Sequence, residues 1–162
     1  MKCMDTNEMR PANKIGYLLE HLQSITGRQS DQVLQEQLGI GFSQFKIMMA
    51  IQWNPHVRQR ALAEALGQTE ASVSRQVRIL FQKGMLTSRV NPAERRERIT
   101  EITPKGLKIA RAARQVMADY HQPMFDELSE KQQKQLLEML VTLHAHTCQP
   151  GKVHACNHPL GL

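Results

Sequence analysis

The sequence predicts a mainly α-helical fold with one small β-hairpin, and three observations lead to this class. Apolar residues recur at helical spacing through most of the chain. One pair of β-rich runs flanks an Asn-Pro turn signal, and no alternation of strands with helices indicates a parallel sheet. The length of 162 residues and the hydrophobic content of 41% fit a single ordinary globular domain.

A long first helix is predicted from about Pro11 to Leu38. Proline suits the first turn, where an N–H group would have no partner within the helix, and the segment Gly39-Ile-Gly41 ends the helix. The apolar positions of this segment recur with a helical period: Ile15, Leu18, Leu19, Leu22 and Ile25.

A second helix is predicted to begin at Ser43, which can serve as its N-cap. It stops at Asn54-Pro55, because proline cannot donate to the helix ladder and restricts the residue before it. Four large apolar residues here are interpreted as core packing, with the lining of a ligand cavity as the alternative: Phe42, Phe45, Met48 and Trp53.

Two short helices joined by a glycine turn follow, which is typical of a helix-turn-helix. The first ends at Gly67, and the second begins after Thr69, a suitable N-cap. Its inward stripe is Val73, Val77 and Leu80. The opposite face is small and basic: Ala71, Arg75, Arg78 and Gln82, flanked by Ser72, Ser74 and Ile79.

A basic hairpin is predicted next, with β-rich runs at 85–90 and 95–102 on either side of Asn91-Pro92. Thr103-Pro104 then begins another helix, which Pro123 kinks or breaks. A capping box at 129–132 opens the last helix, whose apolar residues include Leu136, Leu137, Leu140 and Leu143.

Positive charge is concentrated in the middle of the chain. Between His56 and Arg111 there are twelve Lys or Arg against five Asp or Glu, whereas the remaining residues hold nine against ten. A neutral scaffold with one basic block indicates a polyanionic partner at that block. The alternative is a solvated basic face, and the charge count alone does not decide between the two.

Several short segments carry a family resemblance: Leu62-Ala63, Val73-Ser74-Arg75, Leu80, Lys83-Gly84-Met85-Leu86, Arg89, Glu94-Arg95-Arg96 and Ile102-Thr103-Pro104-Lys105-Gly106. Through them the chain resembles the DNA-binding core of the MarR family of winged helix-turn-helix transcription regulators. The family's wing usually has an aspartate where this chain has Glu94, an acid that is one methylene longer.

The resemblance implies a winged helix-turn-helix core flanked by N- and C-terminal dimerisation helices. It places dimerisation helices at 1–41 and 104–148, the DNA-binding domain at 42–103 and a tail at 149–162. The implied partners are double-stranded DNA, a second copy of the chain and a small-molecule effector, with no required cofactor. The implied function is repression at pseudo-palindromic operators, released by a small-molecule, metal or redox signal.

DNA contacts are expected from the second helix of the pair, the recognition helix, and from the hairpin. Small residues let its backbone approach the bases, and arginine binds guanine or phosphate in bidentate fashion. The hairpin arginines can enter a minor groove, unless one of them, above all Arg96, bonds an acid of its own subunit. The expected DNA-binding residues are Thr69, Ala71, Ser72, Ser74, Arg75, Arg78, Arg89, Arg95 and Arg96.

Cysteine and histidine gather near the C-terminus: His144, His146, Cys148, His154, Cys156 and His158. Three interpretations stay open. The first is a solvated tail with incidental donors, the second is a zinc or copper site, and the third is a redox switch at Cys148 or Cys156. The alternating spacing differs from that of a zinc ribbon or finger.

The sequence therefore favours a sequence-specific DNA-binding regulator over two rivals. A winged domain that binds RNA or a protein partner would use the same basic face. An enzyme is disfavoured, because the sequence has no P-loop, no dinucleotide-binding glycine motif and no Ser-His-Asp order. With no apolar run of membrane-spanning length and no signal peptide pattern, a cytoplasmic location without membrane partners is expected.

Overall fold

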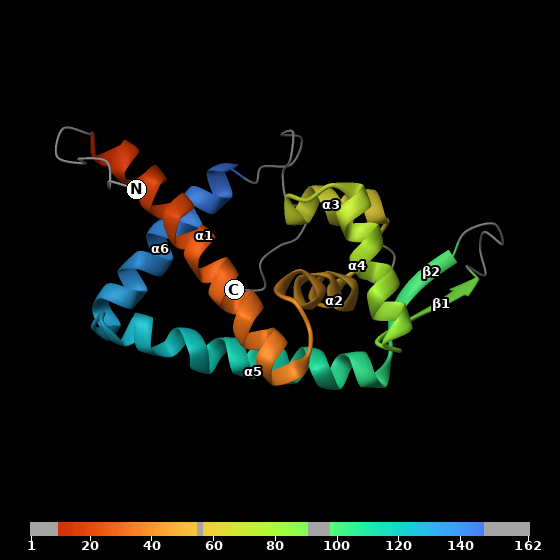
Figure 1. Cartoon of the computed structure of the whole chain (residues 1–162). Helices are drawn as coiled ribbons and strands as arrows, with labels where there is room; N and C mark the ends of the chain where they lie inside the picture. Colours follow the sequence, from red (N-terminus) through yellow and green to blue (C-terminus); the bar gives the residue numbers. More distant parts are fainter. Residues whose placement is uncertain (1–9, 55–56, 91–97, 148–162) are drawn as a thin grey trace, which may run out of the picture. The chain divides into compact units, whose positions relative to one another are not determined.

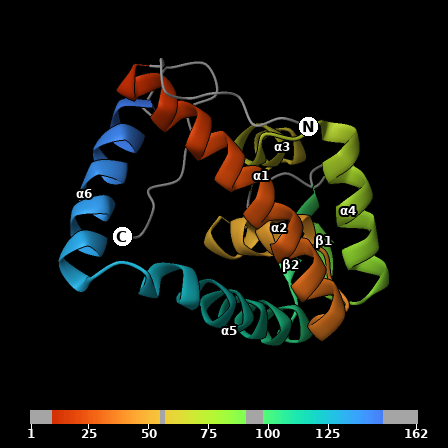
Figure 2. The same cartoon turned by 60° about the vertical axis from the view of Figure 1, so that its left-hand side comes forward.

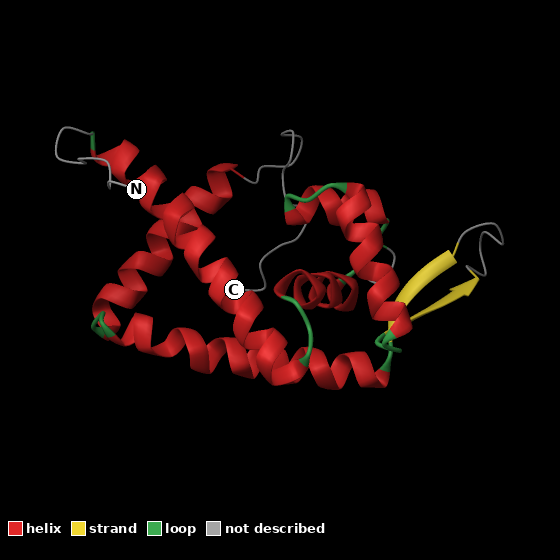
Figure 3. Cartoon of the chain, viewed as in Figure 1, coloured by secondary structure: helices red, strands yellow, loops and turns green. Residues whose placement is uncertain are grey.

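The computed structural model describes residues 10–54, 57–90 and 98–147 and, within them, contains six helices and one two-stranded antiparallel sheet (Figure 1). Helices dominate these residues and the sheet is a single hairpin (Figure 3), which confirms the predicted fold class. The chain separates into two compact units, Met1–Phe42 and Ser43–Leu162. None of the helices in the described ranges is long and apolar enough to cross a membrane.

The first unit consists mainly of one long helix, α1 (Pro11–Leu38), with the bounds that the sequence predicts. It ends at Gly39, whose φ of 64° lies in the left-handed region that favours glycine. Several residues of its apolar stripe are about half exposed. The exposed fraction is 51% for Ile15 and 52% for Leu18. This stripe therefore remains largely open to solvent in the single chain.

Helix α2 (Phe42–Trp53) begins one residue earlier than the sequence predicts. Ser43 was expected to cap it, but this residue lies inside the first turn. The carboxylate of Asp31 accepts the Phe42 N–H at 2.8 Å instead. Because the capping residue Asp31 lies eleven positions before Phe42, no local sequence pattern indicates it. The prediction that Ser43 caps α2 is therefore wrong. The end before Pro55 agrees with the prediction.

Helices α3 (Gln59–Leu66) and α4 (Glu70–Gln82) form the helix-turn-helix pair and pack against each other. Gly67, between them, adopts a φ of 60°, and Gly84, after α4, adopts a φ of 68°. An L-residue with a side chain rarely takes either conformation, so both turns require glycine. The predicted end of α3 at Gly67 is thus confirmed.

Strands β1 (Leu86–Val90) and β2 (Arg98–Ile102) form the hairpin, with Leu86 opposite Ile102 and Val90 opposite Arg98. Helix α5 (Pro104–Asp126) follows directly and packs against β2. It continues through Pro123 rather than breaking there. In Figure 2, α6 (Glu130–Thr147) turns away from the end of α5.

The capping box predicted at the start of α6 is present. The Ser129 N–H donates to the side-chain oxygen of Gln132 at 2.9 Å, and the Gln132 N–H donates back to the Ser129 hydroxyl at 3.4 Å. This reciprocal pair satisfies two N–H groups that the helix itself cannot. It fixes the turn between α5 and α6 by local sequence alone.

The core of the second unit gathers apolar side chains from every element around the helix-turn-helix. The buried residues include Ile47, Met48, Ile51, Leu62, Val73, Val77, Leu80, Met85, Leu86 and Ile99. Val73, Val77 and Leu80 are the predicted inward stripe of α4 and are at most 3% exposed. Burial of this stripe leaves the opposite side of α4 facing solvent.

The prediction that Trp53 packs in the core is wrong, whereas the same prediction for Met48 is confirmed. Met48 is fully buried, but 65% of Trp53 is exposed at the end of α2, and Phe42 and Phe45 are partly buried. Trp53 is the last residue of α2, and no described part of the fold covers its ring. Helical spacing alone could not reveal this.

Candidate DNA-binding interface

The start of helix α4 is fixed by the side chain of Thr69. Its backbone is extended, with φ −77° and ψ 149°, and its hydroxyl accepts the Ser72 N–H at 3.2 Å. This satisfies one of the N–H groups that a helix leaves unpaired in its first turn. Thr69 is therefore the N-cap that the sequence predicts, and it orients the end of α4 where the small residues lie.

The exposed side of α4 combines small residues with two arginines. Ala71, Ser74, Arg75 and Arg78 are exposed, and Ser72 is partly buried beside them. Neither Arg75 nor Arg78 makes a hydrogen bond or an ion pair with any residue of the described ranges. Their guanidinium groups are thus available to an anionic partner, three residues apart and nearly one helical turn from each other.

The hairpin presents a different arrangement at Arg89. Its guanidinium Nε lies 2.6 Å from a carboxylate oxygen of Glu101 on the facing strand. Arg89 was expected in the minor groove, and the alternative was that a hairpin arginine bonds an acid of its own subunit. The structure places such a bond at Arg89, whereas Arg95 and Arg96 lie outside the described residues.

Two hydrogen bonds from the start of α5 hold the base of the hairpin against the end of α4, and a close approach at Gly106 adds to them. The Thr103 hydroxyl donates to the Gly84 carbonyl at 2.8 Å, and the Lys105 ammonium donates to the Lys83 carbonyl at 2.7 Å. At Gly106 an added Cβ would lie 2.2 Å from the Met85 carbonyl oxygen, so only glycine fits. The end of helix α4, the base of the hairpin and the start of α5 are therefore packed tightly together.

Helix α3 adds positive charge that is partly compensated. Arg60 is exposed and lies 3.1 Å from Glu64, one turn along the same helix. The hydrogen bond that Arg60 donates to Glu64, followed by the charges of Glu64 and Glu70, raises the pKa of Arg60. A guanidinium is charged at neutral pH in any case, so the consequence is local compensation of its charge. Arg60 is a weaker candidate for DNA contact than Arg75.

Two pairs of polar residues that the sequence does not predict join α2 to α4 and to the residue before the N-cap of α4. The side-chain nitrogen of Gln44 donates to the side-chain oxygen of Gln76 at 2.9 Å. The Ser43 hydroxyl donates to the side-chain oxygen of Gln68 at 3.0 Å and accepts from its side-chain nitrogen at 2.9 Å. The partners are 32 and 25 residues apart in the chain. Polar residues so far apart in the chain form no periodic pattern in the sequence, so only the folded structure could reveal these contacts.

The predicted Cys/His site falls mostly outside the described residues, since Cys148, His154, Cys156 and His158 lie beyond Thr147. His144 and His146 lie in the last turn of α6, as predicted. Within the described ranges no three His, Cys, Asp or Glu side chains come together as metal ligands would. Metal binding and redox sensing at this site stay predictions.

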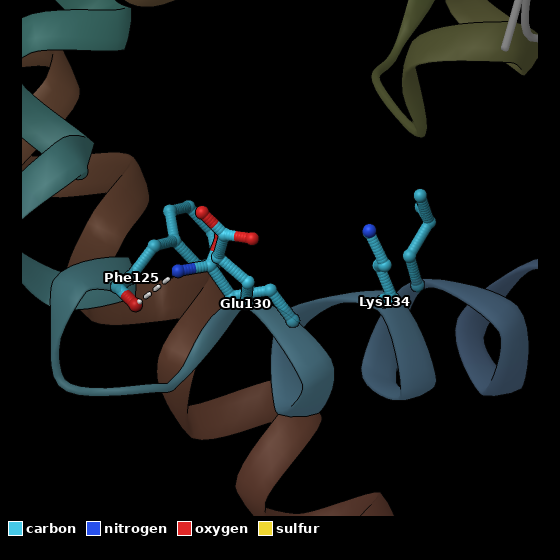
Figure 4. A pocket seen from close by; sticks show the side chains of 5 residues that line it. Phe125, Glu130 and Lys134 are labelled. Atoms are coloured by element: carbon cyan, nitrogen blue, oxygen red, sulfur yellow. Dashed lines mark hydrogen bonds between the residues drawn. The ribbon is translucent and has the colours of Figure 1, made fainter.

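A shallow concavity lies where α5 meets α6, with a volume of about 340 Å³. Phe125, Glu130, Gln133, Lys134 and Leu137 line it, and Gln133 donates to the Phe125 carbonyl at 3.0 Å (Figure 4). Phe125 is 41% exposed and Leu137 is 51% exposed. The concavity is therefore part of a larger exposed apolar surface at this end of the second unit.

Comparison with known proteins identifies the family. Residues 42–97, which cover the helix-turn-helix and lead into the hairpin, match the model of the MarR family. The chain therefore contains a MarR-family domain over these residues. It is 25% identical over 133 residues to a putative transcriptional regulatory protein for the hcr operon of Thauera aromatica, covering 82% of this chain and 80% of that protein. It is 29% identical over 114 residues to the HTH-type transcriptional regulator BilQ of Clostridium symbiosum, covering 68% and 79%.

Solved MarR-family structures share the fold. Apo MarR from E. coli superposes with a TM-score of 0.72 at 22% identity, covering 84% of this chain and 98% of that one. CouR from Rhodococcus jostii, solved with p-coumaroyl-CoA, gives 0.68 at 17% identity, covering 84% and 95%. A MepR mutant from S. aureus, solved with an oligodeoxyribonucleotide, gives 0.53 at 23% identity, covering 82% and 97%. The relatives from Thauera aromatica and Clostridium symbiosum are both described as transcriptional regulators.

Proposed function

We propose that this MarR-family chain is a transcription regulator that binds a specific double-stranded DNA operator through α4. The observation that carries the proposal is the exposed face of α4, where small residues lie beside Arg75 and Arg78, which have no ion-pair partner in the part of the chain that the structure describes. A major groove about 12 Å wide admits one helix, and its base edges and phosphates match guanidinium donors. The oligonucleotide held by the related MepR supports the same partner.

The proposal includes a homodimer that reads a pseudo-palindromic site. Two helices carry apolar side chains that are about half exposed, namely Leu18 and Leu22 in α1 and Leu137, Met139 and Leu143 in α6. Exposed apolar surface of this extent is typical of interfaces. A two-fold axis would present two recognition helices about 34 Å apart, which is one turn of DNA.

The proposal further includes repression that a signal releases. A small molecule is the signal we favour, and the coenzyme A thioester held by the related CouR supports an effector of this kind in the family fold. No cofactor is required for DNA binding in this scheme. The C-terminal Cys148 and Cys156, with their histidines, would supply a zinc, copper or thiol signal only if native protein carries metal or loses free thiols on oxidation.

The test is a selection of binding sites from random duplexes with the purified full chain. The expected result is a pseudo-palindromic consensus whose binding survives excess nonspecific DNA and weakens steeply with salt. Light scattering should show a dimer at the same concentrations. A monomer without preference among duplexes would refute the proposal. Selective binding to RNA instead would favour the rival winged-domain function.

A further inference from the structure

We infer that Ser43 and Gln44, at the start of α2, are positioning residues that set the direction of the DNA-reading face of α4. The inference rests on the proposed function. Neither residue was expected at the interface from the sequence, and both belong to the same compact unit as α4. They reach α4 and the turn before it through directional hydrogen bonds, which apolar packing does not provide.

Gln44 makes the central contact. Its side chain is only 7% exposed, and its amide nitrogen donates to the side-chain oxygen of Gln76 at 2.9 Å. A buried amide is costly unless it is hydrogen-bonded, so this pair is strongly favoured in one geometry. Because Gln44 is buried, it does not itself reach a DNA surface.

Gln76 connects this contact to the reading face. It directly follows Arg75, so in a helix with 3.6 residues per turn their side chains leave the axis about 100° apart. Holding Gln76 against α2 therefore sets the direction in which Arg75 leaves the helix. The buried Val73 and Val77 also hold α4, but hydrophobic contacts are non-directional and allow small rotations.

Ser43 supplies a second fixed point. Its hydroxyl forms hydrogen bonds with the side-chain oxygen of Gln68 at 3.0 Å and with the side-chain nitrogen of Gln68 at 2.9 Å. Gln68 precedes the N-cap Thr69, whereas Gln76 lies in the middle of the helix. The two points are on the order of 10 Å apart along α4. Together the two contacts restrain both the tilt and the rotation of α4. A helix that reads base edges must be held in such a fixed orientation.

The experiment compares Gln44→Met with Gln52→Met, a matched control on the same helix. The side-chain oxygen of Gln52 is buried and has no hydrogen-bond partner among the described residues. We expect Gln44→Met to lose affinity for the selected operator by about tenfold, while its affinity for random duplex changes by less than about twofold. Gln52→Met should bind both duplexes as the unmodified chain does.

A double variant separates positioning from folding. Gln44→Met alone leaves the oxygen of Gln76 without this donor, whereas Gln44→Met with Gln76→Met removes both polar groups and should restore the melting temperature. The operator affinity of the double variant should stay low. Recovery of affinity together with the melting temperature would show a purely structural role and overturn the inference, as would operator binding by Gln44→Met at the unmodified level.

Ser43 offers a conservative rescue. Ser43→Thr keeps the hydroxyl and should retain operator affinity, whereas Ser43→Ala should lose about threefold. Equal affinity for the two variants would contradict the assignment of Ser43.

Hydrogen exchange of the DNA-free protein keeps this inference distinct from the proposed function. Amides of α4 should exchange faster in the double variant than in Gln52→Met, while amides of α5 stay unchanged. If the unmodified chain selects no duplex, the regulator function fails, but faster exchange in α4 still supports the positioning role. Exchange in α4 equal to that of the control overturns it.

Discussion

The recognition helix and the hairpin are both basic, yet they offer their charge to a partner differently. On α4, Arg75 and Arg78 are exposed and make no ion pair within the described ranges. On β1, Arg89 is bonded to Glu101 at 2.6 Å. A formal charge count treats the three arginines alike, but the charge of an arginine that already pairs with a carboxylate is partly compensated, so it gains less from a nearby phosphate. Under the proposed function, we therefore expect α4 to contribute more to DNA binding than the hairpin does.

The largest effect is expected from Arg75→Ala. Loss of a base or phosphate contact should weaken operator binding by about 1 to 3 kcal/mol, with dimerisation unchanged. Fluorescence anisotropy with the selected operator measures the affinity, and light scattering measures the dimer. Arg114→Ala, which removes an exposed arginine from α5, is the matched control for net charge. Equal affinity of the two variants would contradict the role of Arg75.

A smaller effect on stability is expected from Thr69→Ala. Without the hydroxyl that accepts the Ser72 N–H, unfolding should become easier by about 1 kcal/mol. Thr69→Ser retains the cap and should behave like the unmodified chain. Chemical denaturation followed by circular dichroism measures the difference. If both variants are equally stable, the cap does not determine the start of the reading face.

We expect Arg78 to contact phosphate, whereas Arg75 contacts a base or phosphate. Arg78→Ala should therefore affect all DNA sequences about equally, because a phosphate contact carries no sequence information. The slope of log affinity against log salt concentration should fall by about 1 for operator and random duplex alike. Arg78→Lys keeps the charge and should retain the slope. Loss of affinity for the operator alone would instead make Arg78 a base reader and change the division of roles on α4.

The smallest effect is expected at the hairpin. Glu101→Gln removes the carboxylate that pairs with Arg89 and should strengthen binding to random duplex by about 0.5 kcal/mol at low salt. Arg89→Ala should weaken operator binding by no more than a similar amount. Titrations at two salt concentrations test both. A loss from Arg89→Ala as large as that from Arg75→Ala would remove the contrast between the two regions.

Local signals explain why most of the fold could be predicted from the sequence. The glycines at 39, 67 and 84, the caps Thr69 and Thr103 and the box at Ser129 act within a few residues of themselves. The inward stripe of α4 follows from helical spacing, and so does its opposite, outward face. The family likewise could be identified from short segments of the core.

The features that could not be predicted depend on residues far apart in the chain. The cap of α2 comes from Asp31, the partner of Gln76 is Gln44, and Arg89 finds Glu101 on the other strand. Trp53 is exposed although its spacing fits a core position. In each case the outcome depends on which side chain the folded chain brings near, and no local pattern records that.

The tight seat of Gly106 against Met85 has a mechanical consequence. With no room for even a methyl group, the start of α5 packs directly against the start of the hairpin, so we expect the two to move together. Helix α5 has 23 residues and is about 35 Å long at 1.5 Å per residue. A swing of about 5° at its far end would displace its first turn by about 3 Å, close to the spacing of successive base pairs. An angular change of a few degrees would thus shift the hairpin by one step along a DNA groove.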